Sequence, residues 1–118
     1  MSDISKTYLQ TLIDRLAHVE RTQIEAICAA GAICAEAILG DNLVFTFGTG
    51  HGSFAALEMF PRTGTVTGFR PIVESSMISF HRVLGDGGAR QYRFIHAQEG
   101  YGEAILASHQ TCEGDAML

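Results

Sequence analysis

The residues of this chain that could do chemistry gather in one stretch, LVFTFGTGHGSFAALEMF, which runs from Leu43 to Phe60. An apolar run ends at Gly48, Gly50 follows, and His51 stands where a strand would turn into a helix. Glycines let a backbone approach a ligand closely and adopt positive φ, and the start of a helix presents unpaired N–H groups. The segment from Gly48 to Ser53 therefore predicts a cradle for an anion such as phosphate.

Two hydroxyl groups in this segment, on Thr49 and Ser53, could add donors to the cradle, and Gly52 lies between them. The segment is not a GxGxxG loop, because Ser53 stands at the third glycine position. It is not a Walker A loop either, because no Gly-Lys-Ser/Thr follows. A Gly-x-Gly turn after a strand is also a common structural turn, so an anion site and a simple turn both remain open.

Three ionisable side chains accompany the cradle. His51 lies in the turn, Glu58 follows about two helical turns later, and Arg62 is at ion-pair spacing from Glu58. A histidine, a carboxylate and a guanidinium beside an anion site would suit proton transfer next to a carbonyl. The alternatives are a solvated surface pair for Glu58 and Arg62 and a loop-bracing role for His51.

The elements that must position these residues begin with a helical region from about residue 4 to about residue 39, where apolar residues recur at helical spacing. The apolar stripe loses phase near Arg21, which favours two helices over one bent helix. Gly40-Asp41-Asn42 should then stop the helix and turn the chain. We expect a single domain over residues 1–118, with N-terminal helices in 1–40 and the first part of an α/β core in 41–118.

The core begins at Leu43–Phe47, an apolar run without alternation that is typical of a strand covered on both faces of a parallel sheet. Residue composition also predicts the elements that come later in the chain. These are a helix at Ser53–Phe60, a strand within Thr65–Val73, an ambiguous stretch at Ser75–Leu84, a flexible loop at Gly85–Arg90, a helix at Gln98–Ser108 and a strand starting at Ala116. A strand that starts so late predicts that the chain is the front half of a larger domain.

The composition excludes several classes of function. A net charge of −5 argues against a nucleic-acid partner, and 47% hydrophobic residues argue against disorder. The longest uncharged apolar run near the N-terminus, Ile27 to Ala35, is too short to span a bilayer. Three cysteines without CxxC spacing and no visible signal peptide predict reduced thiols in a cytoplasmic protein. We expect no metal site, because His81, His96 and His109 have no ligand spacing to one another or to a cysteine and His18 is expected on a helix as a surface or half-buried side chain. We also expect no cofactor.

With these residues in view, the sequence resembles the SIS (sugar isomerase) domain family, in particular its phosphosugar-binding or phosphoheptose-isomerase-like branch. The segments FGTGHGSFAALEMFPRTGTV and RPIVE carry the resemblance without a gap, and EGYGEAIL and EGDAML resemble later family motifs. The first motif is fairly specific, and the resemblance covers nearly the whole chain. The matching residues are Gly48, Gly50, His51, Glu58, Phe60, Arg62, Gly64, Pro71, Ile72 and Glu74.

The resemblance implies a three-layer α/β sandwich with a parallel, flavodoxin-like sheet, here incomplete, in a homo-oligomer that binds sugar phosphates in carbohydrate metabolism. It implies that the phosphosugar is bound by Gly48, Thr49, Gly50, Gly52, Ser53 and Arg62, with the phosphate at the loop from Gly48 to Ser53. For a catalytic relative it implies aldose–ketose isomerisation, with Glu58 as base and His51 as an oxygen-side proton carrier or substrate ligand. A second phosphate loop, Ser-x-Ser-Gly, would lie beyond Leu118.

This sequence departs from the family pattern in ways that bear on catalysis. Gly52 replaces the family serine after the histidine, with Ser53 one place later, Thr65 replaces a glycine, and Pro61 replaces an aromatic residue. The alternative to an isomerase is therefore a non-catalytic SIS module that senses sugar phosphates or acts in oligomer assembly. A degenerate product without activity is a third possibility.

Overall fold

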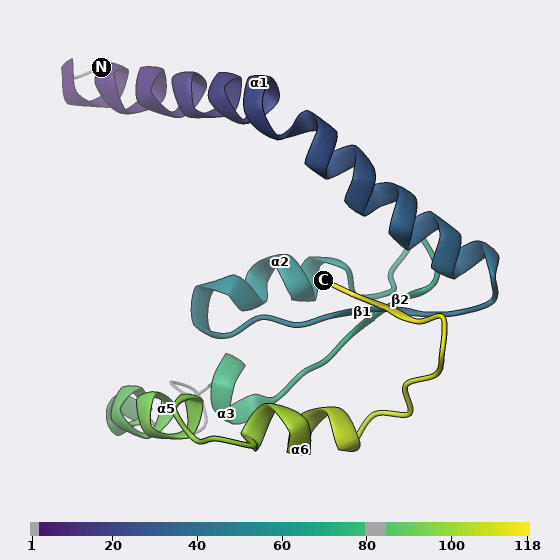
Figure 1. Ribbon diagram of the computed structural model, residues 1–118. Helices are drawn as coiled ribbons and strands as arrows, with labels where there is room; N and C mark the ends of the chain where they lie inside the picture. Colours follow the sequence, from purple (N-terminus) through teal and green to yellow (C-terminus); the bar gives the residue numbers. More distant parts are fainter. Residues whose placement is uncertain (1–2, 80–84) are drawn as a thin grey trace. The chain divides into compact units, whose positions relative to one another are not determined.

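The computed structural model describes residues 3–79 and 85–118 of the 118-residue chain. These residues form helices and three short strands (Figure 1). The strands make one sheet in the order β2-β1-β3. Both strand pairings are parallel. This confirms the predicted α/β class with a parallel sheet. The chain divides into two compact units, Met1–Ala35 and Glu36–Leu118.

The first helix, α1, runs without interruption from Asp3 to Leu39 over 37 residues. The preference for two helices is therefore wrong. The phase of an apolar stripe reports which face of a helix would be covered, whereas helix continuity depends on the backbone. Between its ends α1 has no proline and a single glycine, Gly31, so nothing in the backbone breaks it near Arg21.

Many large apolar side chains of α1 are exposed: Ile4, Tyr8, Leu9, Leu12, Ile13, Leu16, Val19, Ile24, Ile27, Ile33 and Leu39. By length and composition alone α1 could cross a membrane, since an 18-residue window within it has a mean hydropathy of 1.4. Signal sequences and packed helices of soluble proteins meet the same criterion. The expectation of no membrane contact therefore stays a prediction.

The end of α1 is a left-handed turn. The amide of Asn42 donates to the carbonyl of Ala37 at 2.9 Å, and that of Asp41 donates to Ile38 at 3.2 Å, which is the bond pattern of a Schellman motif. Asp41 has a φ of 59°, which aspartate tolerates better than most residues. The predicted helix stop at Gly40-Asp41-Asn42 is confirmed.

The central strand, β1, spans Val44–Thr46 and is buried along its whole length. Phe45 is only 1% exposed, and the Thr46 hydroxyl donates to the carbonyl of Ala56 in the following helix at 3.0 Å. Aromatic and β-branched side chains suit a strand that is covered on both faces. The continuous apolar run was therefore a sufficient signal for this strand.

The two flanking strands, β2 at Phe69–Pro71 and β3 at Ala116–Met117, align Phe69 and Ala116 with Val44. Both strand predictions are confirmed. Pro71 is tolerated because β2 is the last strand on its side of the sheet, where one missing N–H disturbs little. Since all three strands are parallel, their carboxyl ends meet at one edge of the sheet.

Two predicted helices are confirmed with shorter bounds, as α2 (Ser53–Glu58) and α6 (Tyr101–Ala107). The stretch that the sequence left ambiguous begins with a short helix, α3 (Ser75–Ile78). The rest of that stretch, residues 80–84, lies outside the described residues.

The glycine-rich segment Gly85–Arg90 is helical, so the prediction of a flexible loop is wrong. A 3-10 turn, η2, covers Gly85–Gly87, and α5 covers Gly88–His96. Glycine lowers helix propensity only by about 1 kcal/mol per residue, and packing commonly overrides such a cost. Here α5 packs against α3, which supplies that packing.

A carboxylate ties the start of β1 to the turn before β3. Asp115 Oδ1 accepts the amide of Leu43 at 2.8 Å, and Oδ2 accepts the amide of Cys112 at 2.6 Å. These two backbone hydrogen bonds, first that of Leu43, hold the pKa of the Asp115 carboxyl below its ordinary value of 3.8. The negative charge at Asp115 therefore stabilises the fold.

We expect Asp115→Asn to destabilise the protein at neutral pH, because the amide nitrogen cannot accept one of the two N–H groups. Since folding lowers this pKa, the stabilisation is present above the unfolded-state pKa of about 4 and is lost as the pH falls through the folded-state pKa. Urea midpoints of variant and wild type should differ at pH 7 and approach each other progressively as the pH falls below about 4. Asp41→Asn is the control, and an equal gap at both pH values would contradict the electrostatic explanation.

Candidate functional site

The loop from Gly48 to Gly52 joins β1 to α2 at the carboxyl end of the central strand. Backbone pairing continues up to the loop, since the amide of Phe47 donates to the carbonyl of Leu118 at 3.0 Å. A short 3-10 turn, η1, covers Gly50–Gly52. The predicted turn between a strand and a helix is confirmed, and it lies at the edge where open parallel sheets bind ligands.

Two glycines of the loop are required by its shape. A Cβ on Gly48 would lie 2.4 Å from the carbonyl oxygen of Gly52 and 2.8 Å from the amide nitrogen of Ser53. Gly50 has a φ of 52°, which residues with a side chain rarely adopt. The chain thus folds back on itself at Gly48 and reverses its backbone twist at Gly50.

Successive amides at the start of the loop donate to no acceptor that belongs to the described residues. Within the part of the chain that the structure describes, no N–H from Gly48 to His51 donates to a backbone or side-chain acceptor. In contrast, the amide of Gly52 donates to the Thr49 carbonyl at 2.9 Å, and that of Ser53 donates to the carbonyls of Gly50 and His51. The later amides hold the loop closed, and the earlier ones could donate to a ligand.

The two hydroxyl groups of the loop have different roles. Ser53 is 2% exposed, and its hydroxyl donates to the carbonyl of Gly50 at 2.6 Å. The hydroxyl of Thr49 instead accepts a hydrogen bond from the Tyr92 hydroxyl at 3.2 Å. Ser53 therefore braces the loop in this conformation, while Thr49 keeps its own proton for another acceptor.

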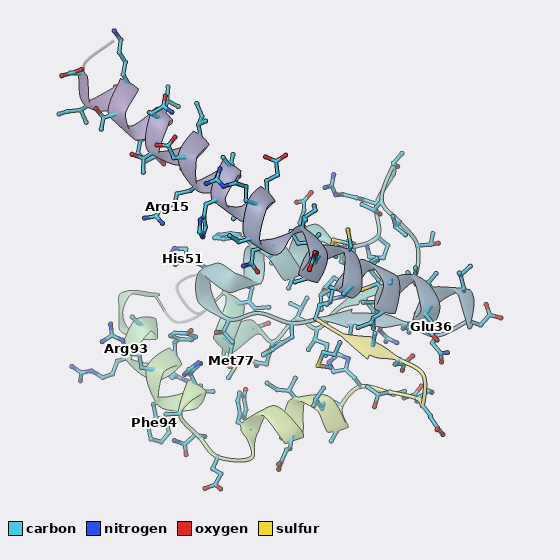
Figure 2. All side chains as sticks on the ribbon, turned by 45° about the horizontal axis from the view of Figure 1, so that its top comes forward. Arg15, Glu36, His51, Met77, Arg93 and Phe94 are labelled. Carbon is cyan, nitrogen blue, oxygen red and sulfur yellow. The ribbon has the colours of Figure 1, made fainter. Side chains whose placement is uncertain are left out.

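His51 extends from the loop with its side chain exposed to solvent (Figure 2). Its ring lies 6.1 Å from the ring of Phe54 at a tilt of 44°. Phe54 is itself 69% exposed. A ligand held by the loop would therefore find an imidazole and an aromatic ring beside it.

Glu58 and Arg62 form the ion pair that their spacing predicts. Both side chains are exposed, Arg62 by 58% and Glu58 by 70%, so solvent screens the pair and its contribution to stability is small. No interaction between the described residues joins this pair to His51. The structure thus brings Glu58 and Arg62 together with each other and leaves His51 with the loop.

Tyr92 is a residue of this site that the sequence did not indicate. It lies on α5, 43 residues from Thr49 along the chain, and its hydroxyl reaches the loop. A Cβ on Gly50 would lie 3.3 Å from the Tyr92 oxygen. No local pattern in the sequence could have found this contact, because α5 itself was not predicted.

Glu74 has a structural role at the end of the neighbouring strand. Its Oε2 accepts the amide of Met77 at 2.9 Å and the hydroxyl of Ser76 at 2.6 Å, and so caps α3. The Ser76 hydroxyl lies 3.2 Å from the Tyr101 hydroxyl. Glu74 and Tyr101 also line a cavity of about 260 Å³, together with other residues of α6 and with His109, which follows that helix.

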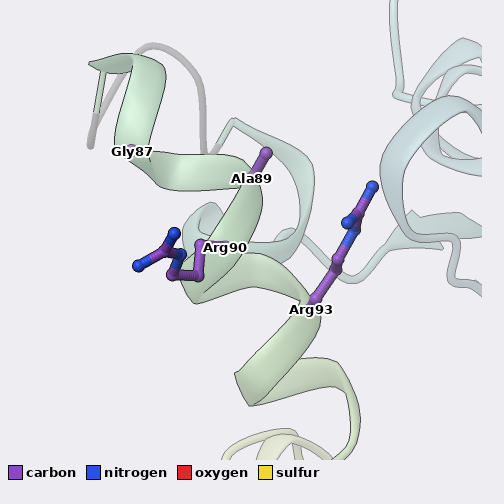
Figure 3. Close-up of a pocket in the computed structure, with 4 residues that line it drawn as sticks. All are labelled: Gly87, Ala89, Arg90 and Arg93. Atoms are coloured by element: carbon purple, nitrogen blue, oxygen red, sulfur yellow. The ribbon is translucent and has the colours of Figure 1, made fainter.

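Two arginines line an open depression of about 490 Å³ on α5, together with Gly87 and Ala89. Figure 3 shows that the side chains of Arg90 and Arg93 leave the helix in different directions. Their guanidinium groups therefore do not converge on one anion.

No group of three or more His, Cys, Asp or Glu side chains is placed to hold a metal ion among the residues that the structure describes. His81 lies outside those residues. The expected absence of a metal site stays a prediction.

A model of the SIS domain family matches residues 7–118. A UPF0309 protein of Brucella anthropi is 30% identical over 118 residues, which cover 100% of this chain and 46% of that protein. A UPF0309 protein of Streptomyces avermitilis is 25% identical over 117 residues, which cover 99% and 45% of the two chains. One of Listeria innocua is 25% identical over 111 residues, which cover 94% and 42%.

The chain therefore spans less than half the length of these relatives. The matched region includes the three parallel strands, the glycine loop and the helices that follow it. On this evidence of sequence and fold, the chain belongs to the SIS domain family.

Proposed function

We propose that this protein binds phosphorylated sugars, with the phosphate at the loop from Gly48 to Ser53. The observation that carries the proposal is the run of amides from Gly48 to His51, which donate to no acceptor in the described residues, beside the Thr49 hydroxyl. Backbone N–H groups that point to one side form a concave anion site without any basic side chain. Such a site is compatible with an acidic chain whose net charge is −5.

We further propose that the protein in its complete form is an aldose–ketose isomerase. Glu58 would remove the proton from the carbon next to the carbonyl and return it to the neighbouring carbon through an enediol. His51 would carry the proton between the two oxygens or bind the substrate, and Arg62 would contact the phosphosugar. The exposed His51 ring beside the loop is compatible with the role given to it.

The second candidate function is a non-catalytic SIS module that senses sugar phosphates or acts in assembly. One observation favours it: Glu58 is largely exposed and engaged with Arg62, away from any described contact with His51. A base that acts on carbon usually works in a site shielded from water. In this second candidate function the loop binds the phosphate, but no isomerisation is catalysed.

We also propose a cytoplasmic homo-oligomer in which the exposed apolar side chains of α1 are covered by a second copy. The physical reason is that eleven large apolar side chains of α1 are exposed, whereas monomeric proteins rarely leave large apolar patches in water. Sedimentation equilibrium tests the oligomer. Recovery of the protein in the membrane fraction would instead favour insertion of α1 into a bilayer.

Binding is tested by isothermal titration of the protein with fructose 6-phosphate, with fructose and inorganic phosphate as comparison ligands. We expect fructose 6-phosphate to bind, inorganic phosphate to bind more weakly and to compete, and fructose to show no saturable binding. Binding of fructose with the same affinity as its phosphate would contradict the loop as a phosphate site.

Restoring the family serine should tighten this binding. Gly52 has φ −62° and ψ −24°, and a Cβ there would meet no atom within 4 Å. Gly52→Ser therefore fits the existing backbone and adds a hydroxyl donor at the mouth of the loop. We expect Gly52→Ser to bind fructose 6-phosphate about threefold to tenfold more tightly than Gly52→Ala, which adds the Cβ without the hydroxyl. Equal affinities of the two variants would show that position 52 does not contact the phosphate.

A further inference from the structure

We infer that Tyr92 is a positioning residue for the anion site: its hydroxyl occupies a lone pair of Thr49 and so directs the Thr49 proton toward the bound phosphate. This inference rests on the phosphate site proposed above and adds a residue from outside its loop. It assigns to α5 the task of orienting the side-chain donor of the cradle.

The hydroxyl groups of Tyr92 and Thr49 are joined by a direct hydrogen bond. Tyr92 Oη donates to Thr49 Oγ1 at 3.2 Å in a half-buried position. A threonine hydroxyl has one proton and two acceptor lone pairs. Because Tyr92 uses a lone pair, the Thr49 proton must point elsewhere. The described residues offer no second hydrogen-bond partner to Thr49 Oγ1, so its proton is available to an external oxygen.

The direction of this donation has an electrostatic consequence. Hydrogen bonds in a chain polarise one another, so a hydroxyl that accepts a bond becomes a stronger donor. A Tyr–Thr–phosphate chain therefore strengthens the one neutral side-chain donor of the cradle. The hydrogen bond from such a donor is strongest when the acceptor oxygen is charged.

Tyr92 is held where this role needs it. The ring packs at 5.7 Å from the ring of His96 one helical turn later. Its phenol end lies against the loop, since a Cβ on Gly50 would come within 3.3 Å of the oxygen and 3.8 Å of Cζ. The short helix α3 contacts both η1 and α5, and so links the loop to the helix that carries Tyr92. Because Gly50 has no side chain, the Tyr92 hydroxyl can occupy the space next to it.

The test is a double-mutant cycle on the affinity for fructose 6-phosphate. Tyr92→Phe keeps the ring and removes the hydroxyl, and we expect it to weaken binding about threefold to tenfold. Thr49→Val removes the donor itself and should weaken binding about tenfold to 100-fold. If Tyr92 acts through Thr49, adding Tyr92→Phe to Thr49→Val should change the affinity by less than about twofold.

Tyr101→Phe is the matched control, because its hydroxyl bonds to Ser76 rather than to the loop. It should retain wild-type affinity, and thermal unfolding should confirm that each variant is folded. Additive effects of Tyr92→Phe and Thr49→Val, or wild-type affinity of Tyr92→Phe in a protein that binds the sugar phosphate, would overturn the inference and leave the phosphate site standing. Absence of binding by the wild-type protein would overturn both.

Discussion

Replacement of Gly48 by alanine should abolish binding of sugar phosphates while the sheet stays folded. The added Cβ would lie 2.4 Å from the carbonyl oxygen of Gly52 and 2.6 Å from its carbonyl carbon. Both are backbone atoms, so no side chain can rotate away. The loop must open, and the amides that follow Gly48 then change their positions.

The expected loss is large because several bonds to the phosphate fail together. Each hydrogen bond to a charged group contributes about 1.5–3 kcal/mol, so losing two of them weakens binding at least about 100-fold. The local overpacking should cost about 1–3 kcal/mol of stability, which urea unfolding would measure. Titration with fructose 6-phosphate measures the binding.

Gly102→Ala is the control for this variant. Gly102 lies in α6, and a Cβ there would meet no atom within 4 Å. The control should bind as the wild type does and should be at least as stable, since alanine is the better helix former. Wild-type affinity of Gly48→Ala would mean that the closed loop is not what holds the phosphate.

Replacement of Glu58 by glutamine should lower isomerase turnover by about 10²- to 10⁴-fold if the protein is the proposed enzyme. The carboxamide has the shape of the carboxylate and can still accept a hydrogen bond from Arg62, but it cannot take up a proton at neutral pH. Affinity for the sugar phosphate should change little, because in the proposed site the loop holds the phosphate. The defect should therefore fall on kcat rather than on KM.

The measurement is the exchange of solvent deuterium into a sugar phosphate, followed together with aldose–ketose conversion. An enediol mechanism places solvent hydrogen on the carbon next to the carbonyl, so both signals should fall in Glu58→Gln. Glu99→Gln, which changes an exposed carboxylate between α5 and α6, should retain both. Undiminished turnover in Glu58→Gln would remove Glu58 from the mechanism. Binding without turnover in the wild type would support the non-catalytic module.

The two substitutions test phosphate binding and catalytic turnover separately. Gly48→Ala acts on binding, which both candidate functions require. Glu58→Gln acts on turnover, which only the isomerase requires. The exposure of Glu58 and its pairing with Arg62 make this second result the one that decides between the candidates.

Local patterns in the sequence were enough for several elements of the fold. The run Leu43–Phe47 predicted a buried parallel strand, Gly40-Asp41-Asn42 predicted the end of α1, and Ala116 predicted the start of β3. Each of these signals depends on a few neighbouring residues: continuous apolar character, a left-handed turn, or β propensity after a turn. The glycine motif between Gly48 and His51 was recognisable for the same reason.

Other features were beyond such patterns because they depend on residues far apart in the chain. Glycines predicted a loop at Gly85–Arg90, but packing against α3 makes the start of α5 helical. The shift of the apolar stripe near Arg21 predicted a helix break that the backbone does not have. Propensity and periodicity describe a segment by itself, whereas these outcomes depend on what the segment packs against.

The sequence by itself determined the α/β class, the family and the position of the glycine loop after the first strand, because these follow from short-range composition and from motif spacing. The tertiary structure alone decided which donors of that loop are free. The Ser53 hydroxyl donates to the Gly50 carbonyl. The Thr49 hydroxyl accepts a hydrogen bond from Tyr92, which lies 43 residues further along the chain. A hydroxyl can turn toward any acceptor within reach, so its role depends on neighbours that only folding brings together.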